Sequence, residues 1–177
     1  MDETSVPILT RLKIRPAESA DVSAITGIYN DAVLNTTATF DIEPRTIDDR
    51  QKWLSHRDIR HPVLVADLDG RVVAWASLAP WSARAAYEAT AETAIYVDSE
   101  SRHQGIGRCL LTALIDQARG HGFRSLIAQV TIESEVSAHL HRSAGFEHVG
   151  TLIGVGEKFG RILDVLILQK RLRDHEP

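Results

Sequence analysis

The chain has 177 residues, 44% of them hydrophobic and 25% charged, and a formal net charge of −4 at pH 7. This composition is ordinary for one globular domain, and no apolar run approaches the roughly 20 residues that a membrane-spanning helix needs. Acidic and basic residues are interspersed, so nothing indicates nucleic acid or an anionic membrane as a partner.

The chain has one cysteine, Cys109, which rules out an internal disulfide and fits a reducing cytoplasm. The first ten residues, MDETSVPILT, have neither the basic region nor the apolar region of a signal peptide. We therefore expect a cytoplasmic protein. Cys109 lies beside leucines in a helical pattern, so we expect a buried thiol without a catalytic role.

The first part of the chain predicts a strand and two helices. RLKIRPA forms a strand that ends at Pro16, which has no N–H to donate. Asp21 is the expected N-cap of a helix over VSAITGIYNDAVL, whose apolar residues recur at helical spacing. After a loop over NTTATFDIEPRT, Thr46 and Asp49 form a capping pair for a helix over residues 47–60.

The rest of the chain predicts a β-rich unit interrupted by two helices. PVLVADLDGRVVAWASLAPW is a hairpin around its Asp-Gly dipeptide, which is typical of a type I′ turn. A helix over about 105–120 ends before Gly122, and a second helix, SEVSAHLHRSAG, stops at Gly145. The other strands are AETAIYVDS, RSLIAQVT, FEHVGTLIGV and RILDVLILQKRL, the last two joined by a turn at GEKFG. This order, with short loops and no repeat, predicts one α/β domain over residues 1–177 with a mixed sheet.

The stretch VDSESRHQGIGRCLL places two glycines, Gly105 and Gly107, where a helix begins. A helix N-terminus exposes unpaired N–H groups and binds anions, and glycines let a phosphate approach those amides. The structural alternative is a turn that only needs positive φ. A dinucleotide fingerprint is excluded because Leu110 stands at its third glycine, and the phosphate-loop pattern G-x-x-x-x-G-K-[ST] is absent.

The same stretch resembles the [RQ]-x-x-G-x-[GA] signature of the GNAT superfamily of acyl-CoA-dependent N-acetyltransferases. SEVSAHLHRSAGF is similar to the later helix motif of that family, N-x-x-S-x-x-L-[YH]-x-x-x-G-[FY]. NTTATFDIEPRT, WSARAAYEATAETAIYV and GRILDVLILQ resemble its phosphinothricin and methionine sulfoximine acetyltransferase branch. These blocks follow in order over residues about 12–172, so the resemblance covers nearly the whole chain.

The resemblance implies a mixed, mostly antiparallel twisted sheet flanked by about four helices, which splays between the strand ending at Val97 and the strand ending at Val130. It implies acetyl-CoA as co-substrate, no metal, and a homodimer. The turn amides would hold the coenzyme pyrophosphate, and the N–H of Val97 or of Tyr96 would bind the acetyl oxygen during catalysis. The implied coenzyme-binding residues are Tyr96, Val97, Arg102, His103, Gln104, Gly105, Ile106, Gly107, Arg108, Ser134 and Ser137.

Acetyl transfer needs a group that removes a proton from the amine, because only the neutral amine attacks a thioester. Glu92 is the first candidate, since the resemblance places it at the glutamate shared by the phosphinothricin-type enzymes. Partway along an apolar strand, its carboxylate would be desolvated, which would raise its pKa. The structural alternative is a solvent-facing acid on an alternating strand that carries Ala94 and Tyr96 on the same face.

His141 is the second candidate, at a position where many superfamily members carry a tyrosine and where this branch typically has histidine. Imidazole titrates near neutral pH, so it can act as a base toward the amine or as an acid toward the thiolate, and both roles stay open. The structural alternative is a partly exposed helix histidine. His139 points to another side of the same helix, and no histidine or cysteine spacing indicates a metal site.

For the acceptor, the resemblance points to the segments around TATF and SARAAYE. Arg84 would pair with a substrate carboxylate or phosphinate, and Phe40 and Tyr87 would wall the pocket. Their structural alternatives are a surface arginine, a core phenylalanine and a strand-edge tyrosine. The sequence departs from the family pattern at Ser134, which is usually asparagine, and at Ile162, which is commonly tryptophan.

We therefore expect an acetyl-CoA-dependent N-acetyltransferase that transfers acetyl directly to the amino group of a small amino acid or analogue, of the phosphinothricin or methionine sulfoximine type. Two alternatives remain. The acceptor amine could be a polyamine, an antibiotic or a protein N-terminus, or the chain could be a non-catalytic acyl-CoA-binding sensor. A sensor would keep the glycine turn and lack the acid–base residues, whereas Glu92 and His141 are present.

Overall fold

The structure, a computed structural model, describes residues 7–172 of the chain. The expectations that concern residues 1–6 and 173–177 lie outside this range. The strands are β1 (Leu12–Pro16), β2 (Val63–Leu68), β3 (Arg71–Pro80), β4 (Thr90–Val97), β5 (Ser125–Thr131), β6 (Glu147–Lys158) and β7 (Arg161–Arg171). The α-helices are α1 (Ile8–Arg11), α2 (Val22–Asn35), α3 (Ile47–Ser55), α4 (Ile106–Gly120) and α5 (Glu135–Ser143). Short 3₁₀ turns lie at Ser19–Asp21, Ala85–Tyr87 and Ser99–Ser101.

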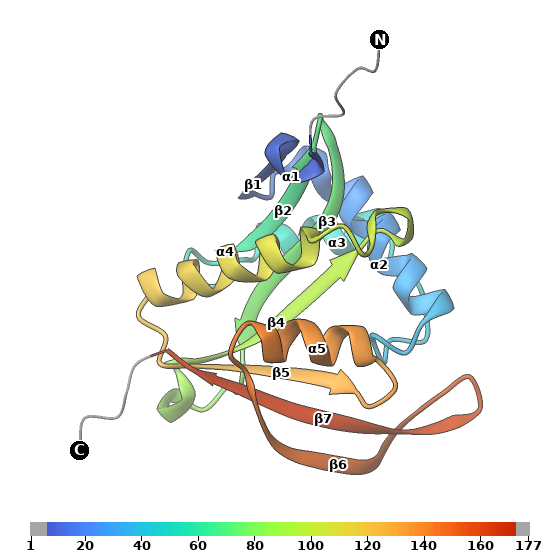
Figure 1. The fold of residues 1–177 in the computed structure, drawn as a ribbon, viewed down its shortest axis with the longest axis vertical. Helices are drawn as coiled ribbons and strands as arrows, with labels where there is room; N and C mark the ends of the chain where they lie inside the picture. The colour runs from blue at the N-terminus through green and yellow to red at the C-terminus, as the bar shows by residue number, and fades with distance from the viewer. Residues whose placement is uncertain (1–6, 173–177) are drawn as a thin grey trace.

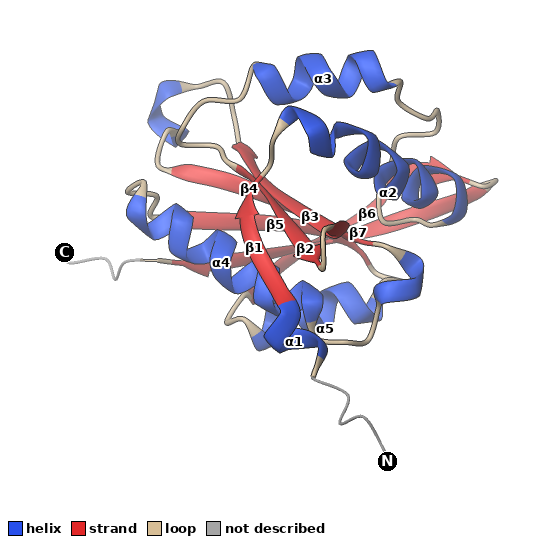
Figure 2. Cartoon of the chain, turned by 90° about the horizontal axis from the view of Figure 1, so that it is seen from above, coloured by secondary structure: helices blue, strands red, loops and turns tan. Residues whose placement is uncertain are grey.

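The strands form one open sheet in the order β1-β2-β3-β4-β5-β7-β6 (Figure 1). Figure 2 shows α2 and α3 on one face of this sheet and α4 and α5 on the other. Neighbouring strands run antiparallel except β4 and β5, which run parallel. The expected α/β domain with a mixed, mostly antiparallel sheet is therefore confirmed, and the short α1 is an addition to the four helices that we expected.

Strands β2 and β3 supply two separate cores, because successive side chains of a strand point to opposite faces of the sheet. Leu64 and Ala76 belong to the larger core, which α4 covers. Val65 and Trp75 belong to a smaller core on the other face, where they meet Ile25 of α2. The sheet is thus buried on both sides along these two strands.

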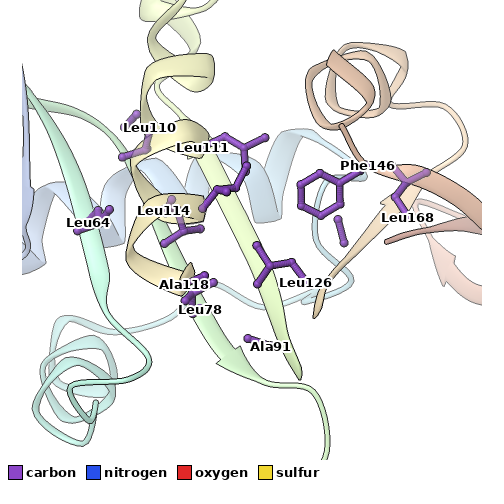
Figure 3. Packing of buried hydrophobic residues seen from close by; sticks show 14 of the residues in the cluster. Leu64, Leu78, Ala91, Leu110, Leu111, Leu114, Ala118, Leu126, Phe146 and Leu168 are labelled. Carbon is purple, nitrogen blue, oxygen red and sulfur yellow. The ribbon is translucent and has the colours of Figure 1, made fainter. Parts of the chain in front are cut away.

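Helix α4 follows the glycine turn, and its apolar residues fall on one face at helical spacing. Leu110, Leu111 and Leu114 are fully buried there and lie over the sheet beside Leu126 of β5 (Figure 3). Burial of such a side chain is worth about 1.5–3 kcal/mol relative to exposure, so this face anchors the helix and the turn before it. Cys109 lies at the edge of that face and is only half-buried, so the expectation of a buried thiol is wrong.

The sheet divides at its centre. β4 and β5 pair over only three register positions, from Thr90 with Ser125 to Glu92 with Ile127. Beyond Glu92 the two strands diverge, and Figure 1 shows them running in different directions from their common start. The expected splay between these strands is confirmed.

Helix α3 ends at Ser55 instead of near residue 60. Its start is as predicted, with Thr46 and Asp49 joined in a capping box. After its end, Asp58 Oδ1 accepts a hydrogen bond of 2.8 Å from the backbone N–H of His61. This side-chain bond closes a turn that competes with continuation of the helix.

Asp21 precedes α2 but does not cap it with its side chain. A 3₁₀ turn leads into the helix and already places Asp21 in a helical conformation, with φ −82° and ψ −13°. Its carboxylate accepts hydrogen bonds of 2.7 and 2.9 Å from the guanidinium of Arg15, and one of 2.8 Å from the backbone N–H of Glu18. The side chain is therefore used to fasten β1 to this turn.

The closing hairpin is tighter than the predicted turn at GEKFG. β6 continues to Lys158, and the turn consists of Phe159 and Gly160, both at positive φ, 53° and 68°. Gly156 and Lys158 are thus strand residues, and successive even-numbered positions at this end of β6 share one face of the strand.

Candidate active site

A cavity of about 330 Å³ lies where β4 and β5 diverge. The splayed part of β4 forms one wall, the end of β5 and α5 form the opposite wall, and the loop after α2 closes a side. The predicted site residues that line this cavity are Phe40, Glu92, Tyr96, Ser134, Ser137 and His141. The fold therefore brings together groups that lie about 100 residues apart in the chain.

Glu92 stands at the last register position that β4 shares with β5. Its Oε1 accepts a hydrogen bond of 2.8 Å from the side-chain amide of Gln129, which lies on β5 just past the end of pairing. Glu92 is half-buried and has a polar partner, so its surroundings are less apolar than we expected. The carboxylate is held at the cavity wall with Oε2 left to contact a ligand.

Gln129 is a site residue that the sequence analysis missed. It is the one polar residue inside the otherwise apolar run LIAQV, and this interruption was the available signal. Its role becomes visible only when β4 and β5 are placed next to each other.

His141 lies on α5 and is 4% exposed, so it is not a partly exposed helix histidine. Its Nδ1 is 2.8 Å from the carbonyl oxygen of Ser137. Because a carbonyl only accepts, Nδ1 carries the hydrogen and Nε2 is left with a lone pair. Nε2 is buried and has no hydrogen-bond partner among the described residues. Burial lowers the pKa of His141, which the bond to Ser137 opposes, so the ring is neutral at pH 7 and can accept a proton.

Strand alternation decides which backbone amide of β4 faces the divergence. The N–H of Asp98 donates to the carbonyl of Val73 on β3 at 2.9 Å, and the pairing with β3 continues unbroken through Val97 and Tyr96. Bonded and non-bonded positions alternate in an antiparallel pair, so Tyr96 bonds to β3 whereas Val97 points away from it. Consistently, the Val97 carbonyl accepts from Arg102 Nε at 3.2 Å. Of the two amides left open above, that of Val97 points away from β3, toward the divergence.

Tyr96 instead contributes its side chain to the cavity wall. Its ring stacks on Trp75 with a centroid distance of 4.8 Å, and Tyr29 meets it edge-on at 5.1 Å. Burial raises the pKa of Tyr96, so its phenol stays protonated near neutral pH. This aromatic cluster makes the base of the cavity rigid.

The turn before α4 presents a run of backbone N–H groups. Within the described part of the chain, the N–H groups of residues 102–107 donate no hydrogen bond, whereas those of Arg108 and Cys109 bond to the carbonyl of Gly105. Gly105 has φ +81° and His103 has φ +62°, which curls the turn. Successive free amides in such a turn at a helix N-terminus fit an anion such as a pyrophosphate.

The two glycines of this turn have different explanations. Gly105 needs its positive φ, as the structural alternative requires. Gly107 does not, and a Cβ on Gly107 would meet Leu140 at 3.4 Å and Val97 at 3.6 Å, which are ordinary contacts. Protein packing thus leaves room for a side chain at position 107. The glycine there is better explained by a ligand that approaches the backbone.

The polar side chains of the turn lie at its surface. Arg102 and Arg108 are exposed, and Arg102 also lies 3.7 Å from Asp31. The Gln104 side chain donates to the carbonyl of Glu100 at 3.3 Å. The arginines of the turn therefore supply positive charge near its amides.

Two predicted acceptor contacts lie elsewhere. Arg84 precedes the 3₁₀ turn between β3 and β4, and Tyr87 is the last residue of that turn. Both residues are exposed, and neither lines the cavity. Phe40 does line it, at 39% exposure, so it is not a core phenylalanine. Within one chain, Arg84 and Tyr87 do not share the cavity with Phe40. Their turn precedes Thr90, the first residue of β4, whereas the part of β4 that lines the cavity begins at Glu92.

Two general features complete the description. Across residues 7–172, no three histidine, cysteine, aspartate or glutamate side chains gather in a way that could hold a metal ion. None of the helices in that range has both the length and the apolar character needed to cross a bilayer.

Comparisons with known proteins agree with this geometry. Residues 14–167 match the model of the acetyltransferase (GNAT) domain. The chain is 40% identical to an L-methionine sulfoximine/L-methionine sulfone acetyltransferase of Pseudomonas aeruginosa, covering 90% of this chain and 94% of that relative. It is 35% identical to a phosphinothricin N-acetyltransferase of Streptomyces viridochromogenes, covering 90% and 87%. An acetyltransferase from Salmonella typhimurium, solved with its cofactor acetyl-CoA, superimposes with a TM-score of 0.91 at 37% identity, covering 94% and 97%.

Proposed function

Because the chain belongs to the GNAT acetyltransferase family, we propose that it transfers acetyl from acetyl-CoA directly to the amino group of a small amino acid or analogue, of the phosphinothricin or methionine sulfoximine type. The observation that carries the proposal is that Glu92 and His141 line the same cavity, at the β4–β5 divergence. The names of the relatives at 40% and 35% identity support the choice of acceptor class.

The coenzyme would bind across the divergence. The free amides of residues 102–107 would hold its pyrophosphate, with Arg102 and Arg108 adding charge at the rim. Ser134 and Ser137 would meet the coenzyme from the α5 side. When bound, the coenzyme supplies an acetyl group activated as a thioester.

The chain's own groups would then remove a proton and stabilise negative charge. An amine with a pKa of about 8 to 10 is mostly protonated at pH 7, so a base must take a proton before the nitrogen lone pair attacks the acetyl carbon. Glu92 takes this proton in our proposal, directly or through a water molecule, and its bond to Gln129 fixes the carboxylate. The N–H of Val97 would stabilise the oxyanion that develops on the acetyl oxygen as the carbon–nitrogen bond forms; the carbonyl would re-form as the carbon–sulfur bond breaks and the thiolate leaves.

His141 offers a second proton acceptor in the same cavity. With Nδ1–H donated to Ser137, only the lone pair of Nε2 is available, so in its resting state the ring can take a proton and cannot give one. We therefore assign it to the second proton, which the amine nitrogen loses after it has attacked the acetyl carbon; the ring accepts this proton, and only the ring so protonated can pass it to the leaving thiolate.

The acceptor would lie against Phe40 and its neighbours on the loop after α2. The structure leaves Arg84 and Tyr87 outside the cavity, so the proposed acceptor site of a single chain does not include them. The proposal needs no metal, nucleic acid or membrane.

We further propose a cytoplasmic homodimer. The single Cys109 fits a reducing compartment. β6 is an edge strand, and with β7 it exposes a row of large apolar side chains. These exposed residues are Val149, Leu152, Ile153, Val155, Phe159 and Ile162.

The test is acetyl-CoA-dependent release of free thiol with a panel of methionine sulfoximine, phosphinothricin, common amino acids, spermidine and a short peptide. Saturable turnover with the first two and little with spermidine or peptide supports the proposal. Turnover restricted to spermidine or peptide moves the chain to another acceptor class. Acetyl-CoA binding without turnover on any amine favours the sensor alternative.

A further inference from the structure

The loop after α2 lines the cavity and has no regular secondary structure. We call residues 36–41 the acceptor strap. Four of its residues, Thr37, Ala38, Thr39 and Phe40, line the cavity. A segment without its own helix or ladder bonds keeps one conformation only if the surrounding protein holds it.

The first contacts that hold the strap come from α2 and β5. The Tyr29 hydroxyl is 3.0 Å from Thr39 Oγ1 and donates to Asp41 Oδ2 at 2.7 Å. Thr37 Oγ1 is 3.2 Å from Thr131 Oγ1 at the end of β5. These bonds fix the side chains of the strap and leave its backbone carbonyls to other partners.

The second set of contacts comes from β6, which lies far from the strap in sequence. Lys158 Nζ donates a hydrogen bond of 2.7 Å to the carbonyl oxygen of Thr39. Lys158 is 3% exposed, and its ammonium forms no ion pair within the described residues. Burial lowers its pKa, and the carboxylate of Asp41 opposes that effect.

Gly156 shares a strand face with Lys158 and touches the next residue of the strap. A Cβ built on Gly156 would overlap Cε2 of Phe40, so the phenylalanine ring rests directly on the backbone of β6. The register of β6 against β7 shifts between Leu152 and Gly156, which turns this end of the strand toward the strap.

Burial of the Lys158 ammonium with a single hydrogen-bond acceptor carries a desolvation cost. An apolar side chain of similar length would avoid the desolvation of an ammonium. An apolar side chain cannot hold the carbonyl of Thr39, and Thr39 is one of the residues that line the cavity. The bond therefore has a use in placing the strap.

We propose that Lys158 and Gly156 are positioning residues for the amine acceptor, which hold the acceptor strap so that Thr39 and Phe40 form the pocket wall before the acceptor binds. This inference rests on the proposed function. It predicts that loosening the strap weakens acceptor binding and leaves coenzyme binding, whose pyrophosphate site we place at the turn before α4, unaffected.

The experiment compares two pairs of variants by steady-state kinetics with the best amine of the panel. Lys158→Met removes the ammonium, and Lys52→Met removes an exposed lysine of α3 as its control. Gly156→Ala displaces Phe40, and Gly150→Ala adds a Cβ to open space in the same strand as its control. We expect Lys158→Met and Gly156→Ala each to raise the KM for the amine by about tenfold, with the KM for acetyl-CoA and kcat within about twofold of the wild type.

The outcomes separate the inference from the function on which it rests. Equal amine KM values for Lys158→Met and Lys52→Met would overturn the positioning role. A rise in both the amine KM and the acetyl-CoA KM together with a fall in kcat would also overturn it, since that pattern indicates general damage to the fold. If Lys158→Met does not fold, Gly156→Ala against Gly150→Ala decides in the same way.

A second readout does not depend on turnover. Chymotrypsin cleaves after phenylalanine, and Phe40 is already partly exposed. We expect faster cleavage at Phe40 in Lys158→Met and Gly156→Ala than in their controls. If the wild type acetylates no amine, the function fails and this rate still tests the strap: unchanged cleavage in both variants would overturn the inference.

Discussion

The side-chain amide of Gln129 bridges 2.8 Å to the carboxylate of Glu92 at the point where β5 leaves β4. The bond therefore lies at the inner end of the cavity. There the backbone pairing of β4 with β5 ends, and the two strands are joined by side chains instead. A carboxylate held in this way keeps one oxygen fixed and one available, which is the arrangement that a positioned base needs.

Replacing the carboxylate tests this role. We expect Glu92→Gln to lower kcat/KM by roughly 10²-fold, because the amide keeps the shape and cannot accept the proton. Gln129→Ala should lower it less, by about threefold to tenfold, since the base remains but loses its orientation. Glu88→Gln, at an exposed glutamate, is the control. Wild-type kcat/KM in Glu92→Gln, with an unchanged circular dichroism spectrum, would contradict the mechanism.

Buried His141 should make stability depend on pH in a defined direction. Its pKa lies below the ordinary value of 6.5 because burial disfavours the charged ring. The unfolded chain therefore binds a proton at this position that the folded chain does not, so the contribution of His141 to the free energy of unfolding is greatest above pH 6.5 and decreases as the pH falls below that value.

We expect His141→Gln to lose less stability than the wild type between about pH 7 and about pH 5. Urea unfolding across this range measures the difference, with His139→Gln, on the exposed side of the same helix, as control. Parallel pH profiles for the wild type and His141→Gln would show that the ring is not held neutral by the fold.

The two glycines of the turn should respond differently to alanine. Gly105→Ala forces a Cβ into φ +81°, so we expect a loss of about 1–2 kcal/mol in the free energy of unfolding. Gly107→Ala should change stability by less than about 1 kcal/mol and raise the KM for acetyl-CoA by about tenfold, because the methyl group stands where the coenzyme approaches the amides.

Gly120→Ala, at the end of α4 with open space around it, is the control and should gain about 0.5–1 kcal/mol. Chemical denaturation and coenzyme titration report the two effects separately. An unchanged KM for acetyl-CoA in Gly107→Ala would place the pyrophosphate elsewhere.

The exposed apolar row on β6 and β7 should be the dimer contact. Ile153 and Ile162 are 74% and 75% exposed in the single chain. We expect Ile162→Glu and Ile153→Glu to convert a dimer into a monomer, because each would bury an unpaired charge in the contact. Light scattering after size-exclusion chromatography measures the mass. Ile59→Glu, at an isoleucine that is 83% exposed elsewhere, should remain dimeric.

Local signals in the sequence predicted local structure well. The Asp69-Gly70 turn has both residues at positive φ, as a type I′ turn requires, and Thr46 caps α3 together with Asp49. Gly105 was identified from its place before an apolar helical run. Each of these depends on the backbone within a few residues, and the residues concerned are adjacent in the chain.

Features that depend on two distant segments were not predicted. Asp21 looked like a helix cap, but the Arg15 that binds its carboxylate is itself held by Asp67 of β2, which lies 52 residues further along the chain. Gln129 acquires its partner only when β5 lies beside β4. Lys158, read as part of a turn, is a buried strand residue because β6 runs on to meet the strap. A pattern of neighbouring residues in the sequence does not predict these contacts between separate elements.

The short pairing between β4 and β5 has a consequence for the stability of the domain. These strands share three register positions, whereas β3 and β4 share seven. The blocks β1–β4 and β5–β7 therefore share few backbone hydrogen bonds at this line, although both contribute to the core under α4. A molecule bound where the two strands diverge contacts both blocks, and its binding free energy adds to their cohesion. If the bound molecule is a substrate, the two blocks would be held together more firmly while it is bound and less firmly after the product has left. The rigidity of the domain would then change during each reaction cycle.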